Sequence, residues 1–87
     1  MIKLKKYKKN DKVEVWWLDA HFDASWLSAD EASTIPDEVY CKSVGYFTKY
    51  TKDVIVLSTS IGEKKKSTQR DRNVIPLGMV RKIHKLR

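Results

Sequence analysis

The sequence lacks the paired cysteines and long apolar segments that stabilise or anchor many proteins outside the cytoplasm. Its single cysteine, Cys41, cannot form a disulfide within the chain, which excludes a disulfide-rich secreted scaffold. No apolar run approaches the ~20 residues that span a membrane, and the first residues are too polar for a signal peptide. With only three Gly and two Pro, the chain is neither collagen-like nor of low complexity. We therefore expect one small domain of 87 residues in a reducing cytoplasm, with no membrane partner.

The sequence also lacks the glycine-rich phosphate loops and the spaced Cys and His residues of common cofactor and metal sites. Asp19, His21 and Asp23 would share one face of an extended segment, but without a fourth ligand a solvated loop is favoured over a metal site. Cys41 could pair with His21 or His84 as nucleophile and base. A cysteine inside a strand is more often a small buried side chain. We expect no enzymatic activity, no metal and no cofactor.

Charge is abundant and unevenly placed along the chain. The formal net charge is +7, from 18 Lys and Arg against 11 Asp and Glu. Residues 1–13 carry a net +5, residues 14–38 a net −7 without any Lys or Arg, and residues 39–87 a net +9. Such basic segments attract a phosphate backbone. The same charges would also let a basic patch of one subunit meet an acidic patch of the next.

Runs of alternating apolar residues indicate short strands. The predicted strands cover residues 13–18, 39–50, 54–60, 73–75 and 79–86. Residues 19–38 form an irregular excursion after the first strand, and residues 76–78 a turn before the last. Gly45, in the longest strand, indicates a bend, a bulge or a close approach of two backbones. The pattern predicts an all-β fold, a small, five-stranded and strongly bent barrel over residues 13–87.

The excursion contains the one helix that the sequence predicts. Ser28 and Glu31 have the spacing of a capping box, which favours a short helix over residues 28–34. The helix is too short to bury much surface by itself. We expect the adjacent Trp26 and Leu27 to pin the excursion to the barrel.

Two basic segments are the best candidates for contacts with nucleic acid. Residues 1–12 form a basic arm, which either stays loose or lies across a partner. Residues 61–72 form a polar loop whose cations could clamp phosphates. The alternative for the loop is a solvated hairpin tip that keeps the protein soluble. The predicted contacts are Lys64, Lys65, Lys66, Arg70 and Arg72, with Lys5, Lys6, Lys8 and Lys9 as accessory contacts.

Aromatic residues stand beside several of these cations. Tyr7 lies among lysines, and Tyr46 and Tyr50 lie close to Lys49. If exposed, these tyrosines would offer stacking surfaces to single-stranded bases. The alternative is that they pack in the core. The core is expected for the remaining large aromatics, Trp16, Trp17, Trp26 and Phe47.

The C-terminal half resembles a known group of small barrels. Residues 54–57 (VIVL), a polar loop, residues 74–80 and Ile83 resemble the last three strands of Sm-like and SH3-like proteins. Residues 17–20, Trp26, residues 41–47 and the Ile-Pro turn also resemble short uncharacterised proteins of phage and prophage origin.

The resemblance implies a fold and an assembly. Sm-like subunits pair edge strands into closed rings, many of which bind single-stranded RNA, so we expect a homo-oligomeric ring of five to seven subunits. The family signature has a basic residue before the glycine, but here Leu77 precedes Gly78. From the resemblance we therefore infer the fold and the ring, and not the family's nucleotide pocket. The expected subunit interface comprises Val54, Ile55, Val56, Leu57, Val80 and Ile83.

Two functions therefore remain open. The favoured one is non-enzymatic binding of nucleic acid, RNA ahead of DNA, by a ring. The alternative is a phage accessory protein, acting in a bacterial cytoplasm, that binds a host protein or sequesters a small anionic ligand between subunits. Binding that persists at high salt would favour the alternative.

Overall fold

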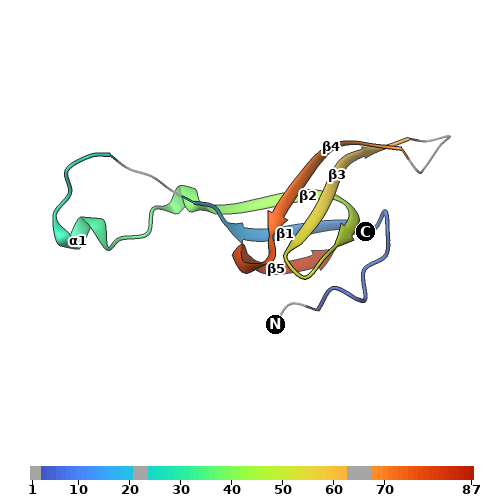
Figure 1. The fold of residues 1–87 in the computed structure, drawn as a ribbon, viewed down its shortest axis with the longest axis horizontal. Coiled ribbons are helices and arrows are strands. Elements are labelled where there is room, and N and C mark those ends of the chain that lie inside the picture. Colours follow the sequence, from blue (N-terminus) through green and yellow to red (C-terminus); the bar gives the residue numbers. More distant parts are fainter. Residues whose placement is uncertain (1–2, 21–23, 63–67) are drawn as a thin grey trace.

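The computed structural model describes residues 3–20, 24–62 and 68–87, except for the side chain of Glu38. Five strands, one short α-helix and two 3₁₀ turns follow one another along these segments (Figure 1). In chain order they are β1 (Lys12–Leu18), α1 (Ala29–Ala32), η1 (Asp37–Val39), β2 (Tyr40–Tyr50), β3 (Val54–Ile61), β4 (Gln69–Pro76), η2 (Leu77–Met79) and β5 (Val80–Lys85). None of the helices described here is long and apolar enough to cross a membrane.

The strands form one antiparallel sheet in the order β4-β3-β2-β1-β5. The long strand β2 belongs to both halves of this sheet. Its first part pairs with β1, from Tyr40 opposite Leu18 to Tyr46 opposite Lys12, and its second part pairs with β3 from Tyr46 onward. The predicted fold class is confirmed: a small five-stranded all-β domain, strongly bent, with a short helix in the excursion after the first strand. The bent sheet stays open, because β4 and β5 remain its two edges.

Gly45 marks a close approach of β2 to its neighbour β3. A Cβ atom at this position would lie 2.9 Å from the backbone oxygen of Ser58 and 3.2 Å from the Cβ of Leu57. Contacts this short force the backbones apart. The close approach predicted at Gly45 is therefore confirmed, and the absence of a side chain is what permits it.

The core lies on the concave side of the bent sheet. Val13 and Val15 alternate inward from β1 and are completely buried, as the two-residue period predicts. Trp17, on the same face, packs against the core and donates a 2.9 Å hydrogen bond from Nε1 to Ser43 Oγ. The other buried members are Leu4, Tyr7, Phe47, Ile55, Leu57, Ile75 and Val80.

The basic N-terminal segment is part of this core. Leu4 and Tyr7 are buried, and the Tyr7 hydroxyl donates to the backbone oxygen of Ile83 at 3.1 Å. The Tyr7 ring lies 5.9 Å from that of Phe47. Residues 3–11 are therefore packed against the sheet and not loose, and Tyr7 is a core residue without a stacking face for a base. The lysines between them are exposed, so the segment buries its two apolar side chains and solvates its charges.

A buried polar network joins the N-terminal segment to β4. Gln69 Nε2 donates to Asn10 Oδ1 at 2.8 Å, and Gln69 Oε1 accepts from the hydroxyls of Thr48 and Ser58 at 2.8 and 2.9 Å. These bonds hold Gln69 in the sheet, so β4 begins there and not at Asn73 as predicted. The exposed polar residues of an edge strand carry no apolar alternation, which is why the sequence pattern missed them.

Residues 19–20 and 24–38 belong to a projection that we call the acidic arm. It leaves the sheet between β1 and β2 and carries α1 near its far end, which gives the molecule a long axis of 55 Å against 25 and 23 Å (Figure 1). The predicted capping box is confirmed: Ser28 Oγ accepts from the Glu31 N–H at 3.1 Å, and Glu31 Oε1 accepts from the Ser28 N–H at 3.2 Å. Trp26 is fully exposed and Leu27 largely so, and the expectation that they pin the arm to the sheet is wrong.

We predict that Gly45→Ala lowers the free energy of unfolding by about 1–3 kcal/mol, because the new Cβ must displace the backbone of β3. Urea denaturation measures this change. Gly78→Ala is the matched control, since a Cβ at Gly78 meets nothing within 4 Å. Equal stability of the two variants would contradict the close approach of β2 and β3.

A second prediction concerns Asp11, which fastens the N-terminal segment. Its Oδ2 accepts from the Lys8 N–H at 2.9 Å, and its Oδ1 lies 3.5 Å from Lys85 Nζ. The hydrogen bond from Lys8, followed by the charge of Lys85, holds the pKa of Asp11 below its ordinary value of 3.8. A lowered pKa stabilises the folded state at pH values above the unfolded pKa, and this stabilisation is lost as pH falls through the folded pKa.

Asp11→Asn should therefore lower the thermal midpoint at pH 7, and the gap to the wild type should narrow as the pH falls below the ordinary value of 3.8. Thermal unfolding followed by circular dichroism at pH 7 and across this acidic range measures the gap. Asp53→Asn, in the loop between β2 and β3, controls for the loss of one negative charge. A gap that is as large at low pH as at pH 7 would show that Asp11 acts by some other means.

Candidate functional site

The structure describes only part of the predicted basic loop. Lys64, Lys65 and Lys66 lie outside the described residues, so their role stays a prediction. Arg70 and Arg72 are exposed on the edge strand β4, where they pair with Ser60 and Ser58 of β3. The N-terminal lysines Lys5, Lys6, Lys8 and Lys9 are exposed as well.

Lys5 belongs to a hollow of about 1010 Å³ that three separate segments enclose. The segments are the N-terminal residues 3–5, the end of β2 with the loop that follows it, and the η2 turn with the start of β5. We call this site the cationic hollow. Its lining consists of the apolar or aromatic Leu4, Tyr50, Leu77 and Val80, the cationic Lys3, Lys5, Lys52 and Arg81, and the small Thr51 and Gly78.

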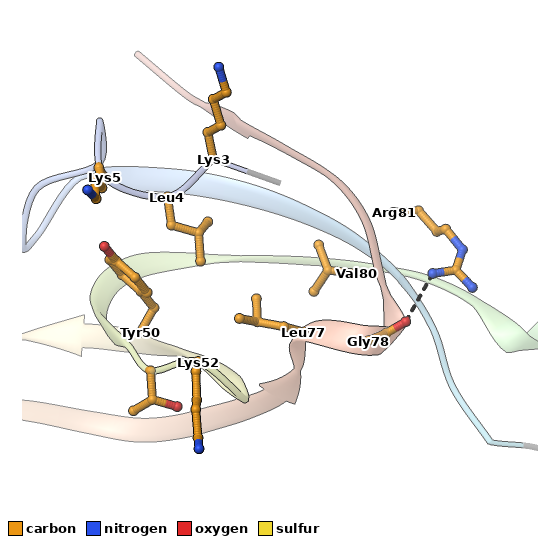
Figure 2. A pocket seen from close by; sticks show the side chains of 10 residues that line it. Lys3, Leu4, Lys5, Tyr50, Lys52, Leu77, Gly78, Val80 and Arg81 are labelled. Atoms are coloured by element: carbon orange, nitrogen blue, oxygen red, sulfur yellow. Dashed lines mark hydrogen bonds between the residues drawn. The ribbon is translucent and has the colours of Figure 1, made fainter. Parts of the chain in front are cut away.

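The side chains of the hollow divide into an apolar floor and a charged margin. Figure 2 shows Leu4, Leu77 and Val80 pointing toward the space between them, whereas Lys3 and Lys52 extend away from it. The four cations of the lining face no carboxylate there, because none of the described lining residues is acidic. The hollow therefore suits a ligand with an apolar or aromatic part and negative charge around it.

Backbone hydrogen bonds fix the walls of the hollow relative to one another. The Leu77 N–H donates to the backbone oxygen of Asp53 at 2.8 Å, which ties η2 to the loop between β2 and β3. The Arg81 guanidinium donates to the Gly78 oxygen at 3.1 Å, drawn as a dashed line in Figure 2. Arg81 is thereby held at the margin while most of its side chain stays exposed.

Tyr50 is the aromatic surface of the hollow. Its side chain is 39% exposed, and its ring lies 6.1 Å from that of the buried Phe47. Contact with a buried ring limits the orientations of Tyr50 and leaves part of its surface open to a ligand. Of the tyrosines that the sequence singled out, Tyr50 fits a stacking role, whereas Tyr46 is half-buried in β2 and Tyr7 is in the core.

A second aromatic cluster occupies the outer face of β1. Trp16 lies next to Lys42 of β2 and Lys82 of β5, whose Nζ atoms are 4.4 and 4.7 Å from its ring centroid. Trp16 Nε1 donates to Glu14, whose carboxylate also lies 3.3 Å from His84 Nε2. Trp16 is thus outside the core, contrary to expectation. Its cation–π and hydrogen-bond partners come from this chain, so the cluster has a structural explanation.

The expected interface residues lie mostly inside the single chain. Ile55, Leu57 and Val80 belong to the core, and Val56 is only 8% exposed. The remaining two, Val54 and Ile83, are half-buried. The chain itself therefore covers most of the apolar surface of β3, and the burial of these side chains does not require a second subunit. A subunit contact through the backbone edges of β4 or β5 stays a prediction.

The chemistry available elsewhere is limited in the part of the chain that the structure describes. No three His, Cys, Asp or Glu residues group there as metal ligands. His21 and Asp23, two members of the possible metal triad, lie outside that part. Cys41 is half-buried, and its Sγ lies 3.7 Å from the backbone oxygen of Val39.

Sequence reasoning found only part of the hollow. It selected Lys5 and Tyr50, each for its own local pattern. It missed Lys3, Lys52 and Arg81 as members of one site, because they come from segments far apart in the chain. No local spacing signals such a site, which exists only once the sheet has bent.

No protein-family model matches this chain, and no curated protein or solved structure is significantly similar to it.

Proposed function

We propose that this protein is a non-enzymatic nucleic-acid-binding protein that holds a single strand at the cationic hollow. The observation that supports the proposal is a hollow whose lining combines four cations, Lys3, Lys5, Lys52 and Arg81, with the part-exposed ring of Tyr50. A cationic groove with an aromatic surface is the usual combination for binding single strands without strict sequence preference.

The two parts of the hollow have separate roles in this proposal. The cations pair with successive phosphates and release the counterions condensed on them. A base stacks on Tyr50 and covers Leu77 beside it. A single strand suits this arrangement better than a duplex, because only unpaired bases expose a face to an aromatic side chain.

Other cations extend the surface beyond the hollow. Arg70 and Arg72 are exposed on β4, and we include them, together with the predicted contacts Lys64, Lys65 and Lys66 that precede β4 in the sequence, as further contacts of the strand. The Sm-like resemblance adds two further elements to the proposal, a preference for RNA over DNA and a ring of five to seven subunits. The resemblance to phage and prophage proteins adds a third, a bacterial cytoplasm as the setting.

The alternative function also has an observation in its favour. Leu4, Leu77 and Val80 make the floor of the hollow apolar, which suits a small amphiphilic anion as well as a base. A site of about 1010 Å³ is at the upper end of the volumes of small-molecule pockets. Sequestration of such an anion, or binding of a host protein, would be less sensitive to salt than binding of a polyphosphate backbone.

We predict that the protein binds a labelled single-stranded RNA 12-mer with an affinity that falls steeply with salt. The logarithm of the binding constant should fall with that of salt concentration by about 0.7 per phosphate contact. Lys52→Ala should weaken binding and make this slope shallower. Lys49→Ala removes the same charge from an exposed position outside the hollow and is the control. Fluorescence anisotropy measures both quantities.

Tyr50→Leu tests the stacking role separately from charge. Loss of one stacked base should weaken binding roughly tenfold at every salt concentration, with the slope unchanged. Tyr40→Leu, an exposed tyrosine outside the hollow, should bind as the wild type does. Undetectable binding of RNA and of the matched DNA at low salt, or equal binding by Lys52→Ala and Lys49→Ala, would contradict the proposal.

A further inference from the structure

The acidic arm exposes large apolar side chains among its described residues. Trp26 is fully exposed, Ile35 is 61% exposed and Leu27 is 42% exposed. The helix α1 between them buries no residue. Apolar side chains gathered on a thin projection mark a contact site, because a projection of this width has no core in which to bury them.

The arm is opposite in charge to the rest of the molecule. Residues 19–38 contain six acidic residues and no Lys or Arg. Asp30, Glu31 and Asp37 are exposed and lie within four positions of Leu27 or Ile35 in the sequence. The cationic hollow has the complementary character, with an apolar floor surrounded by four cations. Complementary charge steers two such surfaces together and fixes their register.

The hollow has room for the apolar side chains of the arm. Its volume of about 1010 Å³ reaches the range of pockets that enclose ligands larger than an indole ring. A tryptophan buries roughly 150–250 Å² and is among the commonest anchors of protein interfaces. Trp26 can therefore pack against Leu4, Leu77 and Val80 inside the hollow, while the acidic residues of the arm lie near Lys52 and Arg81.

The occupant must come from a second chain. Figure 1 shows the arm directed away from the N-terminal segment, η2 and the loop after β2, which together form the hollow. The arm joins the sheet at the ends of β1 and β2 and extends outward along the 55 Å axis of the molecule. A chain in this conformation cannot fill its own hollow, but it presents its arm to a neighbour.

We propose that the acidic arm of one copy docks in the cationic hollow of a second copy, with Trp26 as the anchor. Each copy then contributes one arm and one hollow, so the contact is heterologous and joins copies head to tail. The inference rests on the same hollow as the proposed function and adds its regulation. A docked arm and a single strand occupy one site, so they exclude each other.

The test uses two variants of the full-length protein that are each defective in one half of the contact. Trp26→Ala removes the anchor from the arm, and Lys52→Glu reverses a charge at the hollow. Both residues are exposed, so neither substitution disturbs the core. In sedimentation velocity, each variant alone should associate about 30-fold more weakly than the wild type, as expected for the loss of an interface anchor.

A mixture of the two variants gives the decisive result. Trp26→Ala keeps an intact hollow and Lys52→Glu keeps an intact arm, so an equimolar mixture should form heterodimers of wild-type affinity that do not grow further. Val44→Ala, at an exposed position on the outer face of β2, should associate as the wild type does. A monomeric wild type at millimolar concentration, unchanged association of Trp26→Ala, or a mixture that stays monomeric would each overturn the proposal.

The same variants separate this inference from the proposed function. Trp26→Ala should bind the RNA 12-mer at least as tightly as the wild type, because its hollow is free. Heterodimers without any RNA binding would leave the docking in place and reject the nucleic-acid proposal. RNA binding that depends on Lys52, without heterodimers in the mixture, would reject the docking alone.

Discussion

The long strand β2 is the constraint on which the arrangement of the molecule depends. It pairs with β1 over its first part and with β3 over its second, and the missing side chain of Gly45 leaves room for the close approach to β3. The end of β2 brings Tyr50 and the loop after it to the η2 turn, which the hydrogen bond from Leu77 to Asp53 holds in place. The N-terminal segment covers the remaining side through Leu4. The cationic hollow is the open space left where these three segments meet.

Charge divides the molecule into two parts. The sheet and the N-terminal segment are strongly basic, whereas the acidic arm contains Asp and Glu but no Lys or Arg. Within the basic part many cations are solvated on exposed surface, and a few are paired, as Lys85 is with Asp11. At the hollow four cations lie beside apolar surface without a carboxylate in the described lining. In our proposals a polyanion and the acidic arm of another copy compete for this one site, which links binding to self-association.

The sequence predicted the fold better than the site, for physical reasons. Alternation and capping are local, so the strands, the capping box at Ser28 and the close approach at Gly45 were found, together with the fold class. The N-terminal segment was misjudged because Leu4 and Tyr7 are separated by lysines and show no period, and Trp26 because large apolar residues are usually buried. Neither the convergence of the hollow's cations nor the direction of the arm has a local signature, since both follow from the bend of the sheet.

The most direct test of the account is to map the backbone amide shifts of the protein by NMR during titration with a uridine hexamer. The account predicts that the largest shifts cluster at residues 3–5, 50–52 and 77–81, which adjoin one another only at the hollow. Smaller shifts at residues 68–72 would reflect accessory contacts. Shifts confined to the outer face of the sheet around Trp16, or to the hairpin of β3 and β4, would contradict the assignment of the hollow as the binding site.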